Sequence, residues 1–184
     1  MDNRALAKIS CLLAQGFSYP GPNNCDRTFF ATIEEVADAV GISCNNIYFS
    51  REELCQAYTK LFINEPQGRW APPFSSVYLG AHGLLMDKGR DQAMKFYQEA
   101  GLEPCHSPEP EDFLPTELYF VAKLLDTGKP DLLSRFLKEH MLKWFPCFLR
   151  RLRALKPHPY YLLLAELTSR FLNIIYQEVI DETT

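Results

Sequence analysis

Apolar residues recur at helical spacing along nearly the whole chain, and this periodicity is the strongest constraint on the fold. Leu6, Ile9, Leu13 and Phe17 follow one another at intervals of three or four residues, so they share one face of a helix. No window shows the sustained alternation of apolar and polar residues that predicts a half-buried strand. The sequence therefore predicts an all-α protein.

Proline, glycine and capping residues divide this pattern into separate helices. Ser50 followed by Glu53 has the form of a capping box, and Gly41 and Gly101 occupy the position that closes a helix. Pro115 suits an early helical position, where its missing N–H has no partner in any case. A short turn is expected at residues 77–85 and an exposed loop at 102–111. Helices are expected at residues 6–17, 29–40, 51–62, 90–100, 115–125, 131–141, 146–155 and 160–180.

Length and composition predict one globular domain over residues 1–184. The chain has 184 residues, 47% of them hydrophobic and 23% charged, which is normal for a globular protein with its own core. We see neither repeats nor a linker, and we expect a compact bundle of roughly eight to eleven helices. The net charge of −4 gives no basis for nucleic-acid binding and would suit a basic peptide or simply solubility.

The six cysteines and the N-terminal segment favour a cytoplasmic protein. No two cysteines form a C-x-x-C pair, and their spacing matches no zinc-ligand pattern, so we interpret them as reduced thiols. No apolar run reaches the length of about 18 residues that indicates a membrane span. The first residues lack the charged and apolar regions of a secretory signal.

A rigid corner interrupts the helices at residues 68–80, where the sequence reads GRWAPPFSSVYLG. Pro72 and Pro73 fix their own φ angles and bias the residues before them toward extended geometry. This would hold Trp70, Phe74 and Tyr78 in place, and rigid aromatic side chains lose little entropy on binding a peptide. The alternative is that these rings belong to the core. The segment 68–80 is called the corner below.

Enzyme signatures are absent from the sequence. It contains no G-x-G-x-x-G, no phosphate-binding G-x-x-x-x-G-K-[ST], no G-x-S-x-G and no H-E-x-x-H. The dipeptide Cys105-His106 is more readily an incidental loop pair than half of a metal site. Arg150, Arg151, Arg153 and Lys156 are most simply a solvated helix face. The acidic run Glu109, Glu111 and Asp112 precedes a helix N-terminus, which favours carboxylates, and it could also form an anionic lip for a cationic ligand.

Several segments, in order, resemble the TorD/DmsD family of chaperones, which mature molybdenum-cofactor oxidoreductases exported by the twin-arginine pathway. YTKLF at 58–62, WAPPFSSVYL at 70–79 and PEDFLPTEL at 110–118 are similar to family motifs. HMLKWFPCFL at 140–149 and HPYY at 158–161 are similar to its C-terminal stretches. The resemblance covers nearly the whole chain and implies a TorD-like fold. Two positions depart from the pattern: Phe113 stands where the family usually has histidine, and Ser75 where many members have glutamate.

The resemblance also implies a peptide-binding site. The apolar wall would comprise Tyr58, Leu61, Phe62, Trp70, Pro72, Pro73, Phe74, Ser76 and Tyr78, which Phe113 could extend. The acidic lip would comprise Glu109, Pro110, Asp112 and Glu117. Asp112 could cap the helix that contains Pro115, face a peptide arginine, or do both. In the absence of the family histidine, no imidazole is expected beside Asp112.

The function implied is a non-enzymatic cytoplasmic chaperone. Its partners would be the signal peptide and apo catalytic subunit of a molybdopterin oxidoreductase of the DMSO reductase family, together with the twin-arginine translocation machinery. Alternatives are a NarJ-type assembly chaperone for a membrane-anchored nitrate reductase and a nucleotide-binding or hydrolysing helical enzyme. No cofactor is expected, although the resemblance allows weak interaction with GTP or the molybdenum cofactor. We expect a monomer, with a domain-swapped dimer as the alternative through hinges at 157–159 or 127–130.

Overall fold

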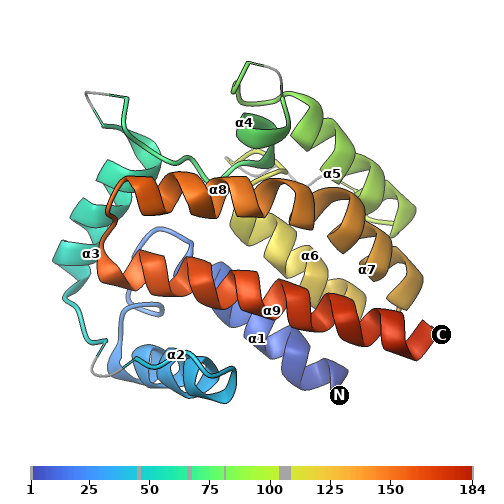
Figure 1. Cartoon of the computed structure of the whole chain (residues 1–184), viewed down its shortest axis with the longest axis horizontal. Helices are drawn as coiled ribbons and strands as arrows, with labels where there is room; N and C mark the ends of the chain where they lie inside the picture. Colours follow the sequence, from blue (N-terminus) through green and yellow to red (C-terminus); the bar gives the residue numbers. More distant parts are fainter. Residues whose placement is uncertain (1, 45–46, 66–67, 81, 104–108, 184) are drawn as a thin grey trace.

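The computed structural model describes residues 2–44, 47–65, 68–80, 82–103 and 109–183, and this part of the chain is all-helical (Figure 1). Its only pairing of extended backbone is the isolated antiparallel bridge between Phe74 and Phe113. The elements are α1 (Asn3–Gly16), α2 (Arg27–Ala39), α3 (Arg51–Tyr58), the π-helical η1 (Thr59–Ile63), α4 (Ser75–Leu79), α5 (Lys88–Glu99), α6 (Leu114–Asp126), α7 (Pro130–Phe136), the π-helical η2 (Leu137–Met141), α8 (Leu142–Ala154) and α9 (Pro159–Thr183).

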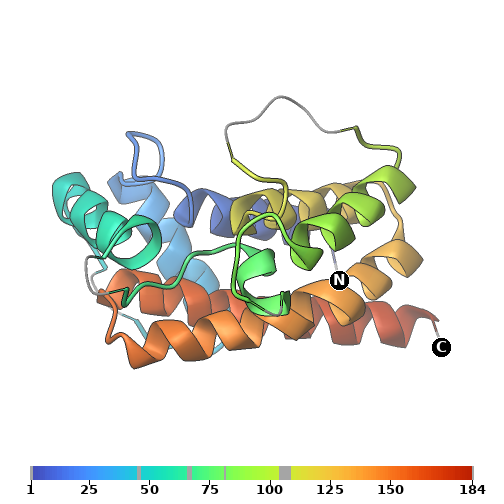
Figure 2. The same cartoon turned by 90° about the horizontal axis from the view of Figure 1, so that it is seen from above.

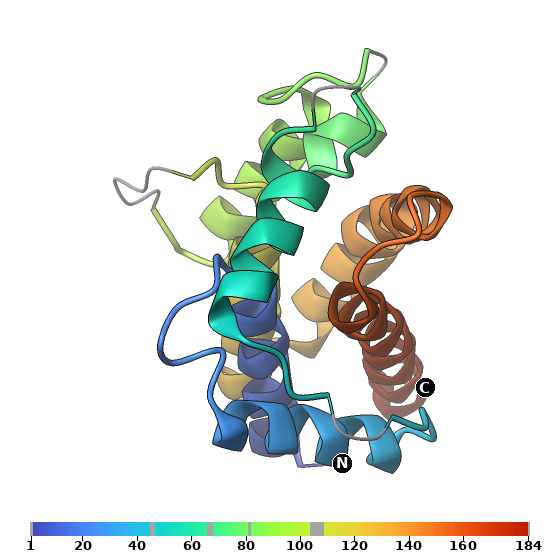
Figure 3. The same ribbon diagram turned by 90° about the vertical axis from the view of Figure 1, so that its left-hand side faces the viewer.

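The helices form two sides that enclose an aromatic core. Helices α8 and α9 lie together on one side, α1, α3 and α6 lie on the other, and α2 crosses one end (Figure 3). Helix α1 packs along α6, where the Ser10 hydroxyl donates to the Leu118 carbonyl at 2.7 Å. The largest fully buried side chains include Trp144, Tyr160, Tyr161, Phe17, Phe136, Phe145 and Phe148. Burial of these rings supplies the main drive for folding.

The predicted helix ends are largely confirmed. Ser50 is the N-cap of α3 and its hydroxyl accepts from the Glu53 N–H at 3.2 Å. Gly41 follows α2 with a φ of 72°, a left-handed conformation that glycine adopts without steric cost. The five cysteines among the described residues are free thiols, as expected. Cys105 and His106 lie outside the described residues.

Two helix predictions were wrong. The segment expected to be a turn at 77–85 begins as a helix, because α4 spans Ser75–Leu79. Helix α8 begins at Leu142 rather than at Pro146, so the proline lies inside it. Helix α8 directly follows the π-helical η2, and Pro146 is the fifth residue of α8. The buried rings of Trp144, Phe145 and Phe148 flank the proline.

Candidate functional site

Three backbone hydrogen bonds hold the corner between η1 and the start of α6. The Ala71 N–H donates to the Leu61 carbonyl at 2.7 Å. The Leu114 N–H donates to the Pro73 carbonyl at 2.9 Å, and the Ser75 N–H to the Asp112 carbonyl at 3.1 Å. The prolines keep this stretch extended, so its backbone groups point sideways and pair with the segment before α6. The corner therefore has a fixed position on the fold.

Asp112 caps α4 and does not cap the helix that contains Pro115, which corrects the expectation from sequence. Its Oδ2 accepts from the Ser76 N–H at 2.8 Å, and the Ser75 hydroxyl lies 3.5 Å away. The N-cap of α6 is Phe113, which forms no side-chain cap. Asp112 is fully buried, and its side chain lies at the N-terminus of α4. The carboxylate thus satisfies an N–H at the N-terminus of α4.

The Ser76 side chain fixes the start of α5 against α4. Its hydroxyl oxygen accepts from the Asp87 N–H at 3.1 Å and the Arg90 N–H at 3.0 Å. The same hydroxyl lies 3.2 Å from the Asp87 carbonyl, to which it can donate. A Cβ on Gly89 would lie 2.3 Å from the Ser76 nitrogen, so only glycine permits this close approach. Figure 2 shows α4 beside α8, with α5 following.

Glu117 lies at the centre of a buried polar cluster that joins α6, η2 and α8. Its Oε1 is 2.6 Å from His140 Nε2, and its Oε2 accepts from Trp144 Nε1–H at 2.9 Å. Glu117 and His140 are both fully buried. Burial raises the pKa of Glu117 and outweighs the opposing effect of His140. An imidazole therefore does lie close to this region, supplied by η2 rather than by the segment before α6.

Most of the residues predicted for the apolar wall are in the interior. The buried ones are Tyr58, Leu61, Phe62, Pro72, Pro73 and Ser76. Trp70, Phe74, Tyr78 and Phe113 are half-buried. Phe74 and Phe113 stack with ring centroids 5.1 Å apart, and Tyr78 stacks on Trp144 at 5.7 Å. The corner thus offers a narrow set of aromatic edges, above a layer of buried side chains.

The residues predicted for the acidic lip also differ in burial. Asp112 and Glu117 are fully buried, so neither faces solvent in this structure. Glu109 is exposed and Pro110 is half-buried. Glu111 forms a two-bond ion pair with Arg90, at 2.5 and 3.0 Å, and this contact lowers the pKa of Glu111. Burial, followed by the Glu109 charge, raises the pKa of Tyr58, so Glu109 acts on the region where η1 begins.

Sequence reasoning missed the residues that position this site from other helices. Arg90 forms an ion pair with Glu111, and the absence of a side chain at Gly89 allows α4 to approach α5 closely. His140 and Trp144 form hydrogen bonds with Glu117. A signal for the last two was present in the stretch HMLKWFPCFL, which contains both residues. Their partner could not be identified from it, because pairing across helices is not local.

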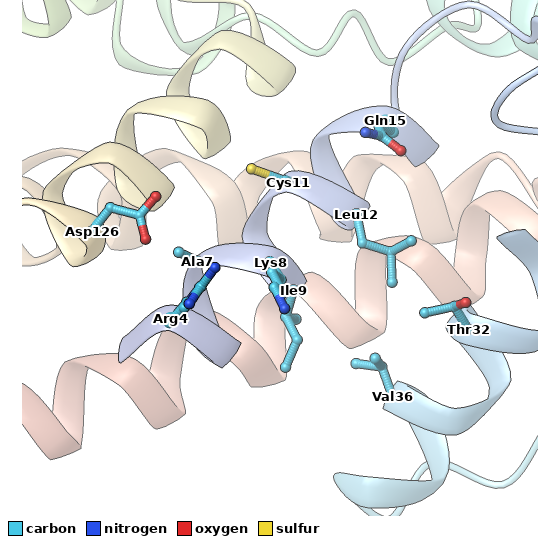
Figure 4. A pocket seen from close by; sticks show the side chains of 10 residues that line it. All are labelled: Arg4, Ala7, Lys8, Ile9, Cys11, Leu12, Gln15, Thr32, Val36 and Asp126. Carbon is cyan, nitrogen blue, oxygen red and sulfur yellow. The ribbon is translucent and has the colours of Figure 1, made fainter. Parts of the chain in front are cut away.

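A pocket with an apolar lining lies away from this site (Figure 4). It has a volume of 370 Å³ and lies between α1 and α2, beside the end of α6. Its floor is apolar, and Arg4 and Lys8 of α1 and Asp126 of α6 lie at its edge. None of the predicted site residues lines it. The described residues also hold no group of three or more His, Cys, Asp or Glu side chains able to bind a metal ion.

Comparisons with known proteins match this chain to one family and to relatives named as chaperones. The family "Nitrate reductase delta subunit" matches residues 30–150, which include the corner, α4 and Glu117. DmsD of Haemophilus influenzae, named as a Tat proofreading chaperone, is 31% identical over 66% of this chain and 60% of its own length. The chaperone TorD of Photobacterium profundum is 29% identical over 59% of this chain and 56% of its own. The chain therefore spans less than two thirds of these relatives.

One solved structure matches over almost its whole length. This structure is a candidate redox enzyme maturation protein from Archaeoglobus fulgidus. The match covers 94% of this chain and 94% of the other, with 25% identity and a TM-score of 0.63. The helical fold described here is thus shared with this solved structure. Among the described residues, no helix has the combined length and apolar character needed to cross a membrane.

Proposed function

Since the chain belongs to the nitrate reductase delta subunit family, we propose that it is a maturation chaperone for a molybdenum-cofactor oxidoreductase. In this proposal it binds the twin-arginine signal peptide and apo-form of its client in the cytoplasm. It holds both until the cofactor is loaded and the enzyme can be exported. The names of the relatives DmsD and TorD support this function.

The arrangement of rings and acidic groups at the corner is the observation that carries the proposal. The stacked, half-buried Phe74 and Phe113 lie at the bridge between the corner and the acidic segment 109–112, which begins with the exposed Glu109. A peptide with paired arginines followed by apolar residues has the complementary chemistry. An exposed carboxylate–arginine pair contributes only about 0.2–1 kcal/mol. Burial of about 400 Å² of apolar surface contributes on the order of 10 kcal/mol before ordering costs.

These magnitudes assign different roles to the two parts of the site. Apolar contact supplies affinity, and the acidic segment sets the register of the peptide. Trp70 and Phe74 are the proposed anchors, since rigid rings lose little entropy on binding. We further propose that the protein is a single-domain monomer without enzymatic activity, and that any domain-swapped dimer forms through the connections at 127–130 or 157–159. Light scattering on a sizing column measures the oligomeric state.

The proposal is tested with a synthetic peptide that carries an arginine pair followed by an apolar stretch of about 12 residues. Calorimetric titration should show binding, and Trp70→Ala or Phe74→Ala should weaken it by about 2 kcal/mol while the melting temperature is kept. Tyr48→Ala, at an exposed ring outside the corner, is the matched control. A large fall in melting temperature for Trp70→Ala would assign that ring to the core.

The family name favours a second candidate, an assembly chaperone of the NarJ type for a membrane-anchored nitrate reductase. Such a client keeps no functional export signal. Its chaperone should therefore bind the peptide equally well after both arginines are changed to lysine, whereas a twin-arginine chaperone should lose affinity. A nucleotide-hydrolysing function predicts turnover of GTP by the purified protein, which we do not expect because the sequence has no phosphate-binding loop.

A further inference from the structure

The connection between α4 and α5 exposes three consecutive apolar side chains. Leu84, Leu85 and Met86 are 60%, 47% and 63% exposed, and the described residues contain no other such run of large apolar side chains. Figure 1 shows this connection rising from α4 on the side away from α9. Single exposed apolar residues are ordinary, whereas large contiguous apolar patches mark interaction sites. The three residues are called the apolar tip below.

The base of this connection is fixed to the corner. The Ser76 hydroxyl in α4 binds the backbone N–H groups of both Asp87 and Arg90, beyond the tip. At the other end, a Cβ on Gly80 would lie 2.2 Å from Asp87 Oδ2, so the two ends of the connection are in contact. Asp112 holds Ser76 in turn. The position of the tip is therefore set by the residues that build the corner.

The backbone at the tip adopts a conformation that the residue type does not favour. Met86 has a φ of 58°, and only one other described non-glycine residue, Lys156, has a positive φ. Glycine or asparagine would adopt this conformation more readily and would expose less apolar surface. The chain has a methionine here, a flexible side chain that adapts to varied apolar surfaces. Neither the strain nor the exposure contributes to the packing of this fold.

The corner itself leaves an apolar partner with little surface. Tyr58, Leu61, Phe62, Pro72 and Pro73 are buried, so the wall expected from sequence exposes only the edges of its half-buried rings. The apolar tip is attached directly to that corner through α4. The acidic Glu109 and Glu111 lie in the segment before α6, whereas the one carboxylate next to the tip, Asp87, caps the Lys88 N–H.

We infer that the apolar tip Leu84–Met86 is a second contact for the client, which takes the apolar stretch that follows the arginine pair. The inference rests on the proposed function and deepens it. The arginine pair lies toward the acidic segment, the corner rings contact the residues after it, and the tip covers the apolar stretch beyond.

The test compares two peptides on the full chain. The long peptide has an arginine pair followed by an apolar stretch of about 12 residues, and the short peptide ends about four residues after the pair. The variant combines Leu84→Ser, Leu85→Ser and Met86→Asn. It should bind the long peptide about tenfold more weakly, the factor that corresponds to a loss of about 1.4 kcal/mol. Its affinity for the short peptide should equal that of the wild type.

Controls separate this inference from its alternatives. Tyr119→Ser removes a large exposed ring from α6 and should change neither affinity. The melting temperature of the tip variant should be at least that of the wild type, since the changed side chains are exposed and asparagine tolerates the positive φ. If the wild type binds neither peptide, the proposed function fails. If the wild type binds both and the variant binds the long peptide equally well, the inference alone is refuted.

Self-association is the competing use of the same surface. Sedimentation equilibrium of the wild type and the tip variant measures it directly. A wild-type dimer that the variant abolishes would show that the tip contacts a second copy and would overturn the assignment to the peptide. Monomers for both proteins, together with the loss of affinity for the long peptide, support the assignment.

Discussion

Replacement of Glu117 by alanine should be among the most damaging single changes in this protein. The carboxylate accepts from Trp144 Nε1–H at 2.9 Å and lies 2.6 Å from His140 Nε2. Alanine would leave both ring nitrogens buried without partners and would leave a void the size of a carboxymethyl group. Removal of one partner from a buried, hydrogen-bonded pair typically destabilises a protein by about 3–5 kcal/mol. For a chain of this size the melting temperature should fall by roughly 10 °C.

The pH dependence of Glu117→Gln tests why the carboxyl is tolerated in the interior. Burial raises the pKa of Glu117 above its ordinary value of 4.5, so the folded protein holds this proton more tightly than the unfolded chain. The resulting contribution to stability is full below 4.5 and is lost as the pH rises through the raised pKa. Glutamine does not titrate. The stability advantage of wild type over Glu117→Gln should therefore shrink as the pH rises from 4.5 through the raised pKa of Glu117.

Urea unfolding of the wild type, Glu117→Gln and Glu117→Ala, at a series of pH values from below 4.5 upward, measures the differences in their free energies of unfolding. Glu166→Ala is the matched control, because Glu166 pairs with Arg153 at the surface and should contribute at most about 1 kcal/mol. An advantage of wild type that grows with pH would refute the reasoning. It would show that the fold prefers the ionised carboxylate, with His140 as the dominant influence.

Three further changes test the corner. Gly89→Ala should destabilise the fold by roughly 1–3 kcal/mol in thermal melts, because the added Cβ would lie 2.3 Å from the Ser76 nitrogen. Gly21→Ala is the control, since the atom nearest to its added Cβ is 3.7 Å away. Asp112→Asn should lower the free energy of unfolding by about 0.5–2 kcal/mol, because it weakens the cap of α4. It should also lower peptide affinity by an amount that does not depend on salt concentration. A loss of affinity that high salt abolishes would instead indicate that Asp112 pairs directly with a peptide arginine. Phe113→His should keep the fold and add an inflection near about pH 6.5 to peptide binding, and an unchanged, flat profile would show that this position does not contact the peptide.

Helix positions and caps were predictable from sequence because they depend on local pattern. The Ser50 cap and the glycine at 41 act on neighbouring residues, so the sequence alone reveals them. Helix α4 depends on Asp112, which lies 36 residues from the Ser76 that it caps, and this explains why a turn was expected there. No local pattern reports such a partner.

The interior position of the two acidic residues escaped prediction for the same reason. The resemblance placed Asp112 and Glu117 in a solvent-facing lip, and charged residues just before a helix and in its first turn are usually exposed. Their hydrogen-bond partners lie far away in sequence, with His140 and Trp144 following Glu117 by 23 and 27 residues. Burial of a carboxylate is tolerated only where such partners exist. Their presence can be known only once the helices are packed.

The dependence of α4 on distant residues also fixes when the corner can form during synthesis. A helix of five residues, Ser75–Leu79, is too short to persist in water by itself. Its cap comes from Asp112, and the backbone of the corner pairs with residues 112–114. A nascent chain that ends before this segment therefore has the prolines but no ordered corner. The surface proposed for the client can therefore form only after residues 112–114 have been synthesised.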